Sequence, residues 1–176
     1  MAKVDANALI AALNGAIGGL VFRRMPDGSV LVSTAPNYGG RKRKSTRKQK
    51  DHQRRFKQAT MFARSAAKAF PLYAELAQGT MKSPYNFALS DWFHPPVIHQ
   101  VKLEGEKILV RATDNIQVSR VQVTLRDGEG KVLEKGAAAR REGDWWEYTP
   151  GTAGKTITAQ AWDLPGHSGT LSIMWN

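Results

Sequence analysis

Apolar and polar residues alternate through much of the second half of the chain, as they do in a strand with one buried face. The alternation is clearest in Ile108/Val110/Ala112, Val121/Val123/Leu125, Ile157/Ala159/Ala161 and Leu171/Ile173/Trp175. It predicts seven strands, over residues 97–103, 107–113, 118–126, 130–137, 145–149, 155–162 and 169–175. Short strands in regular succession, separated by Gly- and Pro-containing turns, are typical of an antiparallel β-sandwich.

The first half carries apolar residues at a helical period. The spacing alternates between three and four residues along Phe56, Ala59, Ala63, Ala66, Phe70, Tyr73 and Ala77. Such a stripe predicts a helix with one buried face, and Ser45 or Thr46 can cap its start. Pro71 should kink or restart the helix, and Gly79 should end it. A further short helix is predicted over residues 84–90, with proline at its first position.

A β-hairpin is predicted ahead of these helices. The β-prone runs 21–25 and 29–33 flank the turn sequence Pro26-Asp27-Gly28, which is a strong hairpin signal. Residues 5–20 are rich in alanine and glycine, and we interpret them as a short helix or a packed apolar arm. An isolated hairpin is marginally stable in water, so it should pack on another part of the chain or on a second copy.

Two stretches of the second half carry a resemblance to known proteins. They are Val110–Asn115 running into Val118–Val123, and Ala159–Gly166; each ends a strand in Ala-x-Asp before a turn. Through them the second half resembles the Ig-like modules of many bacterial surface and structural proteins. Gly18–Arg24 and Gln53–Phe56 make the first half similar to small uncharacterised bacterial and phage-associated proteins. Ig-like modules serve as scaffolds, spacers and adhesive units alike, so the resemblance implies no established activity.

The chain is therefore expected to be α+β: an N-terminal hairpin and basic helices, followed by an all-β immunoglobulin-like sandwich of about seven strands. The stiff sequence His94-Pro95-Pro96 stands between the two patterns. We expect one region over residues 1–92, with the apolar arm, the hairpin over 21–33 and helices over about 45–90. The sandwich should occupy residues 93–176.

Charge is distributed very unevenly between these regions. Residues 1–92 hold 16 Lys and Arg against 5 Asp and Glu, whereas residues 93–176 hold 10 of each kind. The whole excess of +11 thus belongs to the first region. Such asymmetry indicates a polyanionic partner.

The excess concentrates in one run that ends inside the predicted helix. Ten cations lie within 17 positions: Arg41, Lys42, Arg43, Lys44, Arg47, Lys48, Lys50, Arg54, Arg55 and Lys57. They would repel one another unless a polyanion compensates them, and phosphates are the favoured polyanion. An acidic protein, self-contact, an anionic lipid or glycan, and a solvated tail are the alternatives. No base-reading module is present in the sequence, so binding should be non-specific.

Self-association is expected through the hairpin, and Leu20, Phe22, Val30 and Val32 are the candidate contact residues. The neighbouring Trp145 and Trp146 must point to opposite faces of their strand. One should fill the core, and the other is a candidate interface aromatic.

Catalysis, cofactors and metals have little support in the sequence. The chain lacks cysteine, its four histidines do not share a spacing that aims two of them at one metal, and no Gly-x-Ser-x-Gly or Walker motif occurs. Asp114 and Asp163 are expected to cap turns. The apolar run 8–22 is too short to span a membrane, and we expect no signal cleavage. Cellular location stays open, including incorporation into a particle or an extracellular assembly.

These features predict a non-enzymatic structural or assembly protein. It would self-associate through its N-terminal arm and hairpin and hold a polyanion, DNA or RNA, through the basic helix. The alternative is a monomeric, adhesin-like Ig-like module that binds a glycan or a protein and carries a basic tail.

Overall fold

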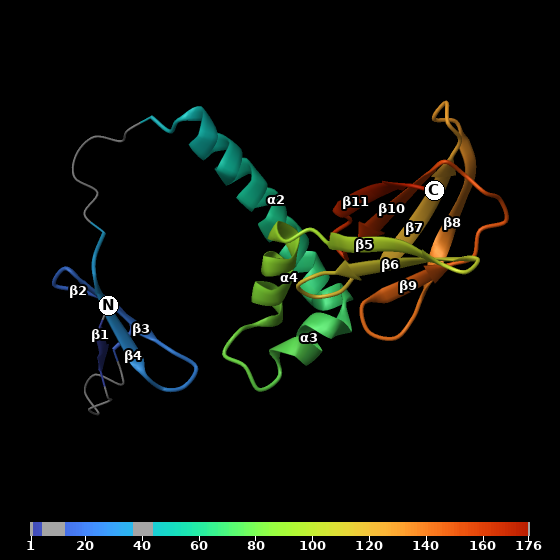
Figure 1. The fold of residues 1–176 in the computed structure, drawn as a ribbon. Coiled ribbons are helices and arrows are strands. Elements are labelled where there is room, and N and C mark those ends of the chain that lie inside the picture. The colour runs from blue at the N-terminus through green and yellow to red at the C-terminus, as the bar shows by residue number, and fades with distance from the viewer. Residues whose placement is uncertain (1, 5–12, 37–43, 176) are drawn as a thin grey trace. The chain divides into compact units, whose positions relative to one another are not determined.

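The computed structural model describes residues 2–4, 13–36 and 44–175 (Figure 1). They form two compact units: Met1–Arg54 with Gly79–Met81, and Arg55–Gln78 with Lys82–Asn176. The division falls inside one helix. The first unit holds a small sheet, and the second holds helices and a larger sheet.

The small sheet is antiparallel, with strand order β1-β4-β3-β2. Its strands are β1 (Ala2–Val4), β2 (Gly15–Ile17), β3 (Leu20–Arg24) and β4 (Val30–Thr34). The predicted hairpin is β3 and β4, in which Phe22 lies opposite Val32. At its turn Asp27 Oδ1 accepts the Ser29 backbone N–H at 2.9 Å, and Gly28 adopts a φ of 82°.

The prediction of a helix or packed arm over residues 5–20 is wrong for its second half. Residues 15–17 form β2, which pairs with β3. The turn between them consists of Gly18 and Gly19, whose φ values are 56° and 80°. Two consecutive positive φ values suit a tight hairpin turn, and glycine adopts them without a steric cost. Residues 5–12 of this prediction lie outside the described residues.

Three helices follow: α2 (Arg47–Ala69), α3 (Pro71–Ala77) and α4 (Pro84–Phe93). The predicted restart at Pro71 is present. Ser83 caps α4, because its side chain accepts the Asn86 backbone N–H. The predicted apolar stripe buries Ala59, Ala63, Ala66 and Tyr73.

The helices have a small core of their own within the second unit. Ala63, Ala66, Tyr73 and Ala88 are its buried members. Ile116 and Leu164, from turns of the large sheet, pack against it. The helices and the sheet therefore share buried surface.

The large sheet is antiparallel, with strand order β11-β10-β7-β8-β9-β6-β5. Its strands are β5 (Val97–Glu104), β6 (Lys107–Thr113), β7 (Arg120–Arg126), β8 (Val132–Arg140), β9 (Trp145–Tyr148), β10 (Thr156–Trp162) and β11 (Ser168–Met174). Strands β8 and β9 pair only at Ala139–Glu147 and Arg140–Trp146. Along the sheet, β5, β6 and β9 lie on one side of this short link, and β7, β8, β10 and β11 lie on the other.

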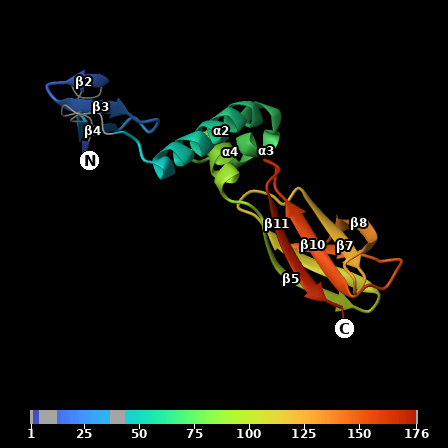
Figure 2. The ribbon, with the colours of Figure 1, turned by 90° about the horizontal axis from the view of Figure 1, so that it is seen from above.

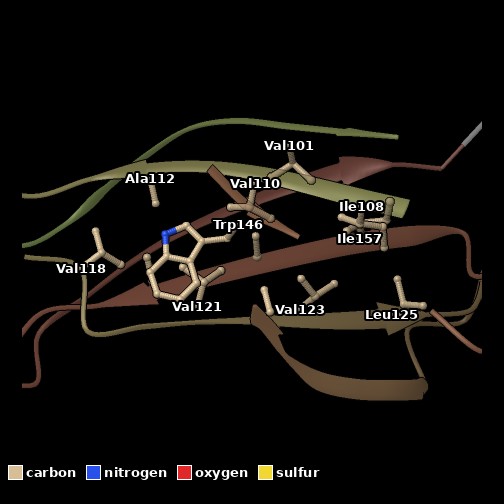
Figure 3. Packing of buried hydrophobic residues seen from close by; sticks show 13 residues of the cluster. Val101, Ile108, Val110, Ala112, Val118, Val121, Val123, Leu125, Trp146 and Ile157 are labelled. Carbon is tan, nitrogen blue, oxygen red and sulfur yellow. The ribbon is translucent and has the colours of Figure 1, made fainter. Parts of the chain in front are cut away.

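The core enclosed by the large sheet follows the predicted alternation. Val121, Val123 and Leu125 of β7 point inward with Ile157, and Val110 of β6 faces them (Figure 3). The indole of Trp146 lies among Ala112, Val118 and Val121 in the same view. One face of each inner strand is thereby removed from water.

The sheet nearly closes on itself, because β5 and β11 lie side by side (Figure 2). Where they meet, the backbone of β11 at Gly169 lies very close to that of Pro96, which directly precedes β5. A Cβ added at Gly169 would lie 2.1 Å from the Pro96 carbonyl oxygen. The prediction of an α+β chain whose second half forms seven antiparallel strands is confirmed.

Candidate polyanion-binding surface

The basic helix α2 begins at a capping box. Thr46 N donates to Gln49 Oε1 at 2.8 Å, and Gln49 N donates to Thr46 Oγ1 at 3.3 Å. The two bonds satisfy backbone and side-chain groups reciprocally at the helix start. The helix therefore has a defined beginning in spite of the repulsion between its cations.

The described members of the basic run are all exposed to solvent. Lys44 precedes the helix, and Arg47, Lys48, Lys50, Arg54, Arg55 and Lys57 lie on it. Arg54 contacts Asp51 at 3.6 Å, in a pair in which both side chains are more than half exposed. Such a pair contributes little. Arg41, Lys42 and Arg43 lie outside the described residues.

The cations of α2 lie in the part of the helix that is exposed to solvent. Arg47, Lys50 and Arg54 follow one another at spacings of three and four residues, so they share a face. Every residue from 47 to 58 is exposed, and the buried alanines begin at Ala59. Residues 47–58 span about 18 Å at 1.5 Å per residue.

Two further cations of α2 were missed in the sequence analysis. Arg64 and Lys68 are exposed and lie seven and eleven residues after Lys57, which places all three on one face. The gap between Lys57 and Arg64 interrupts the run of cations, but the spacings of seven and four residues keep the helical period. That period is the signal in the sequence that could have revealed Arg64 and Lys68.

The candidate self-association residues differ in accessibility. Leu20 is 40% exposed, Phe22 and Val32 are half-buried, and Val30 is buried. Strand β2 lies at an edge of the small sheet, and its Ile17 is 55% exposed. A second chain can therefore reach the backbone of β2 more easily than that of β4, which lies between β1 and β3.

The two tryptophans differ in burial, as expected for neighbouring residues of one strand. Trp146 is a buried member of the core, and Trp145 is half-buried. The Lys102 ammonium lies 5.0 Å from the centre of the Trp145 ring. Trp145 also lines a hollow of about 430 Å³ with Arg141 and Glu142.

A buried polar cluster lies between the helices and the large sheet. The Tyr73 hydroxyl donates to Asp91 Oδ2 at 2.5 Å. With its amide nitrogen turned toward the acids, Asn115 donates to Asp91 Oδ1 and Asp114 Oδ1 at 3.2 Å each. Burial, supported by the charges of Asp114 and Asp163, raises the pKa of Asp91 to about 7, although the Tyr73 hydrogen bond acts in the opposite direction.

The two other aspartates of this cluster cap turns. Asp114 Oδ1 accepts the backbone N–H groups of Ile116 and Gln117, and Asp163 Oδ1 accepts that of His167. Burial raises the pKa of Asp163 as well. Among the described residues, no group of three or more acids, histidines or cysteines is arranged to hold a metal ion. Asp91 is fully buried, so a substrate cannot reach it in this conformation.

None of the described helices is both long and apolar enough to cross a membrane. No protein-family model, curated protein or solved structure matches the chain.

Proposed function

We propose that this chain is a non-enzymatic structural or assembly protein that holds nucleic acid, without sequence preference, along helix α2. The observation that carries the proposal is the exposed cationic face of α2, which no described acidic element covers. Lysine and arginine bind phosphates and release condensed counterions, and this drives sequence-independent association.

The dimensions of the helix suit a nucleic acid. A duplex carries one phosphate per about 1.7 Å of its axis, so the roughly 18 Å of exposed helix corresponds to about ten phosphates. Six described cations stand along that length. Arginines among them can bind a phosphate through two nitrogens.

We further propose that the large sheet is an Ig-like sandwich that serves as a rigid body. Its order places β10 between β7 and β11, and β6 between β5 and β9. The immunoglobulin arrangement likewise has a middle strand in its three-stranded layer and a second sheet packed on it. The balanced charge of residues 93–176 supports a scaffold role, with the polyanion held by the first region.

The nucleic-acid proposal predicts a steep dependence of affinity on salt. If about five phosphates are contacted on duplex DNA, the log–log slope should be roughly −4 to −5. Replacing Arg54 and Arg55 by glutamine should make the slope shallower by about two and weaken unrelated sequences alike. Fluorescence anisotropy with labelled duplexes at several salt concentrations measures both quantities.

The matched control replaces two exposed cations outside α2 by glutamine: Arg111 of β6 and Lys131, which directly precedes β8. It removes the same charge from the chain and should leave the slope almost unchanged. Equal effects of the two double variants would assign the binding to net charge. Absence of duplex binding at low salt would overturn the proposal and leave an acidic protein or subunit contacts as the partner of α2.

Self-association is proposed to use the exposed edge of the small sheet. An unpaired edge strand offers backbone donors and acceptors to a second chain, and Ile17 and Leu20 add exposed apolar surface beside it. Removing residues 1–33 should convert an oligomer into a monomer in size-exclusion chromatography with light scattering. An oligomer of unchanged size would place the contact on another surface, with Trp145 the next candidate.

The alternative, a glycan-binding module, is favoured by one observation. Trp145 lines a hollow with charged neighbours, and aromatic rings of this kind stack on sugars. Loss of glycan binding on replacing Trp145 by alanine, together with no binding of nucleic acid, would favour this alternative.

A further inference from the structure

A second hollow, of about 520 Å³, lies within the second unit beside the basic helix. Three segments that are distant in sequence line it: α2, the end of α4, and the turn before β11. Its main side chains are Arg55, Gln58, Trp92, Phe93, His167 and Ser168. Its size falls in the range of small-molecule sites.

Aromatic rings form the wall of this hollow. The Trp92 ring meets the His167 ring edge-on, with 4.6 Å between their centres. The centre of the Phe62 ring lies 5.3 Å from that of Trp92, and the two rings are tilted by 43°. Phe93 stacks on Phe56 at 6.3 Å, and Phe56 remains 46% exposed although it is a large apolar side chain.

The imidazole of His167 lies beside Asp163. Its backbone N–H donates to Asp163 Oδ1 at 2.6 Å, and its Nδ1 lies 3.3 Å from Asp163 Oδ2. The second ring nitrogen, Nε2, is on the opposite side of the imidazole. Asp163 itself is buried, so its charge is not presented to a ligand.

The polar groups of the hollow suit an anion joined to a flat ring. Arg55 supplies a guanidinium, and Gln58 and Ser168 supply neutral donors and acceptors. No acidic side chain is among its lining residues. Arg55 is one of the cations of α2 and follows Arg54 directly, so phosphates bound along the helix would pass beside a hollow that can bind a ring.

We propose that this hollow binds an unstacked base of single-stranded nucleic acid, with the adjoining phosphate on Arg55. The inference rests on the proposed function and narrows its substrate to strands with accessible bases. Proteins that bind single strands combine a cationic track with aromatic rings on which bases stack, without strong sequence preference. A duplex would contact the cations of α2 but would keep its bases out of the hollow.

The test compares the affinity of labelled oligo(dT) of about 20 nucleotides with that of a duplex, using the whole chain. Replacing Trp92 by leucine should weaken oligo(dT) binding about tenfold, the effect of losing one stacked base, and leave duplex binding unchanged. Ser168→Leu should have the same selective effect, because leucine occupies the hollow without offering a ring. The matched control is Trp145→Leu, which should change neither affinity.

Tryptophan fluorescence gives a second readout. Oligo(dT) should quench the wild-type emission, and the Trp92→Phe variant should lose most of that quenching while it still binds. Because Trp92 supports neighbouring rings, a thermal melt must show that its variants are folded; Ser168→Leu keeps the test valid if they are not.

The outcomes separate the two proposals. Duplex binding with no selective loss of oligo(dT) binding in Trp92→Leu and Ser168→Leu overturns the base-binding inference and leaves the proposed function standing. Absence of binding to either nucleic acid overturns both. Displacement of oligo(dT) by a neutral oligosaccharide that protects Trp92 from quenching would assign the hollow to a glycan and overturn the inference.

Discussion

The variant Asp91→Asn should become more stable than the wild type as the pH rises from 4 to 8. Asp91 is fully buried on α4, and burial raises the pKa of its carboxyl to about 7. In the unfolded chain an aspartate titrates near 3.9. The folded state therefore holds the proton more tightly, and ionisation of Asp91 destabilises the fold.

The sign of the effect fixes the pH window. Well below pH 4 the carboxyl is neutral in both the folded and the unfolded state, and there is no penalty. Between about pH 4 and 7 the unfolded state loses its proton first, so the free energy of unfolding falls; above about pH 7 the penalty is complete. Its upper limit is about 4 kcal/mol, from three pKa units at 1.36 kcal/mol each. Asparagine cannot ionise and escapes this penalty.

The measurement is the difference in unfolding free energy between wild type and Asp91→Asn, from urea melts at pH 4, 6 and 8. The wild type must be compared with the variant at each pH, because other acids contribute a pH dependence of stability with the opposite sign. Glu134 accepts bonds from the Tyr148 hydroxyl and from the backbone of Gly151 and Thr152, which lowers the pKa of its carboxyl to about 2. A difference that stays constant with pH would show that Asp91 is ionised without penalty in the folded chain.

Tyr73→Phe provides the companion variant. The hydroxyl of Tyr73 stabilises the ionised form of Asp91 and lowers its pKa against the effect of burial. Phenylalanine keeps the ring and removes that bond, so the pKa of Asp91 should rise further. The loss of stability should then continue to a higher pH than in the wild type, and Asp91→Asn in the same background should remove it.

Strands and helices were predictable where a local pattern determines them. The alternation in Val121/Val123/Leu125 and Ile157/Ala159/Ala161 corresponds to β7 and β10, whose inward side chains are all buried. A period of two determines the buried face of such a strand without reference to its partners. The stripe from Ala59 to Tyr73 determined the buried face of the helices in the same way.

Strand β2 was missed because its short sequence has no such pattern. Gly15-Ala16-Ile17 contains a single large apolar residue, and all three positions are exposed. Small residues are compatible with a helix and with a strand alike. Residues 15–17 can form a strand because the pair Gly18-Gly19 permits the tight turn to β3.

The sequence revealed the run of cations in α2, but not which other residues lie beside that run on the surface. Counting cations found Arg47 to Lys57 and missed Arg64 and Lys68, because their spacing matters only once they are on a helix. The aromatic hollow joins residues near 55, 92 and 167. No pattern along the chain relates these positions; they meet only because α4 and the turn before β11 pack together.

Gly169 is a second position whose importance is not evident from the sequence. It lies in β11 opposite Ala161 and has no special backbone conformation. An added Cβ would lie 2.1 Å from the Pro96 oxygen and 3.2 Å from the Pro96 carbonyl carbon. Both are backbone atoms, so no side chain can turn away to make room.

Gly169→Ala should therefore destabilise the second unit by about 3 kcal/mol, at the upper end of the cost of overpacking. The start of β5 must move away from β11, where the sheet nearly closes, and the contacts of both strands loosen together. A thermal or urea melt measures the loss. Gly128→Ala is the matched control, because a Cβ there has nothing within 4 Å and the residue has no positive φ.

A third glycine shows why the identity of the crowding atom matters. A Cβ at Gly136 would lie 2.4 Å from the ring of Tyr148, and a ring can shift where backbone cannot. Gly136→Ala should thus cost less than Gly169→Ala, with the ring displaced from the surface of β8. If Gly169→Ala were as stable as Gly128→Ala, the β5 and β11 backbones would have to lie farther apart in solution, and the near-closure of the sheet would not contribute to its stability.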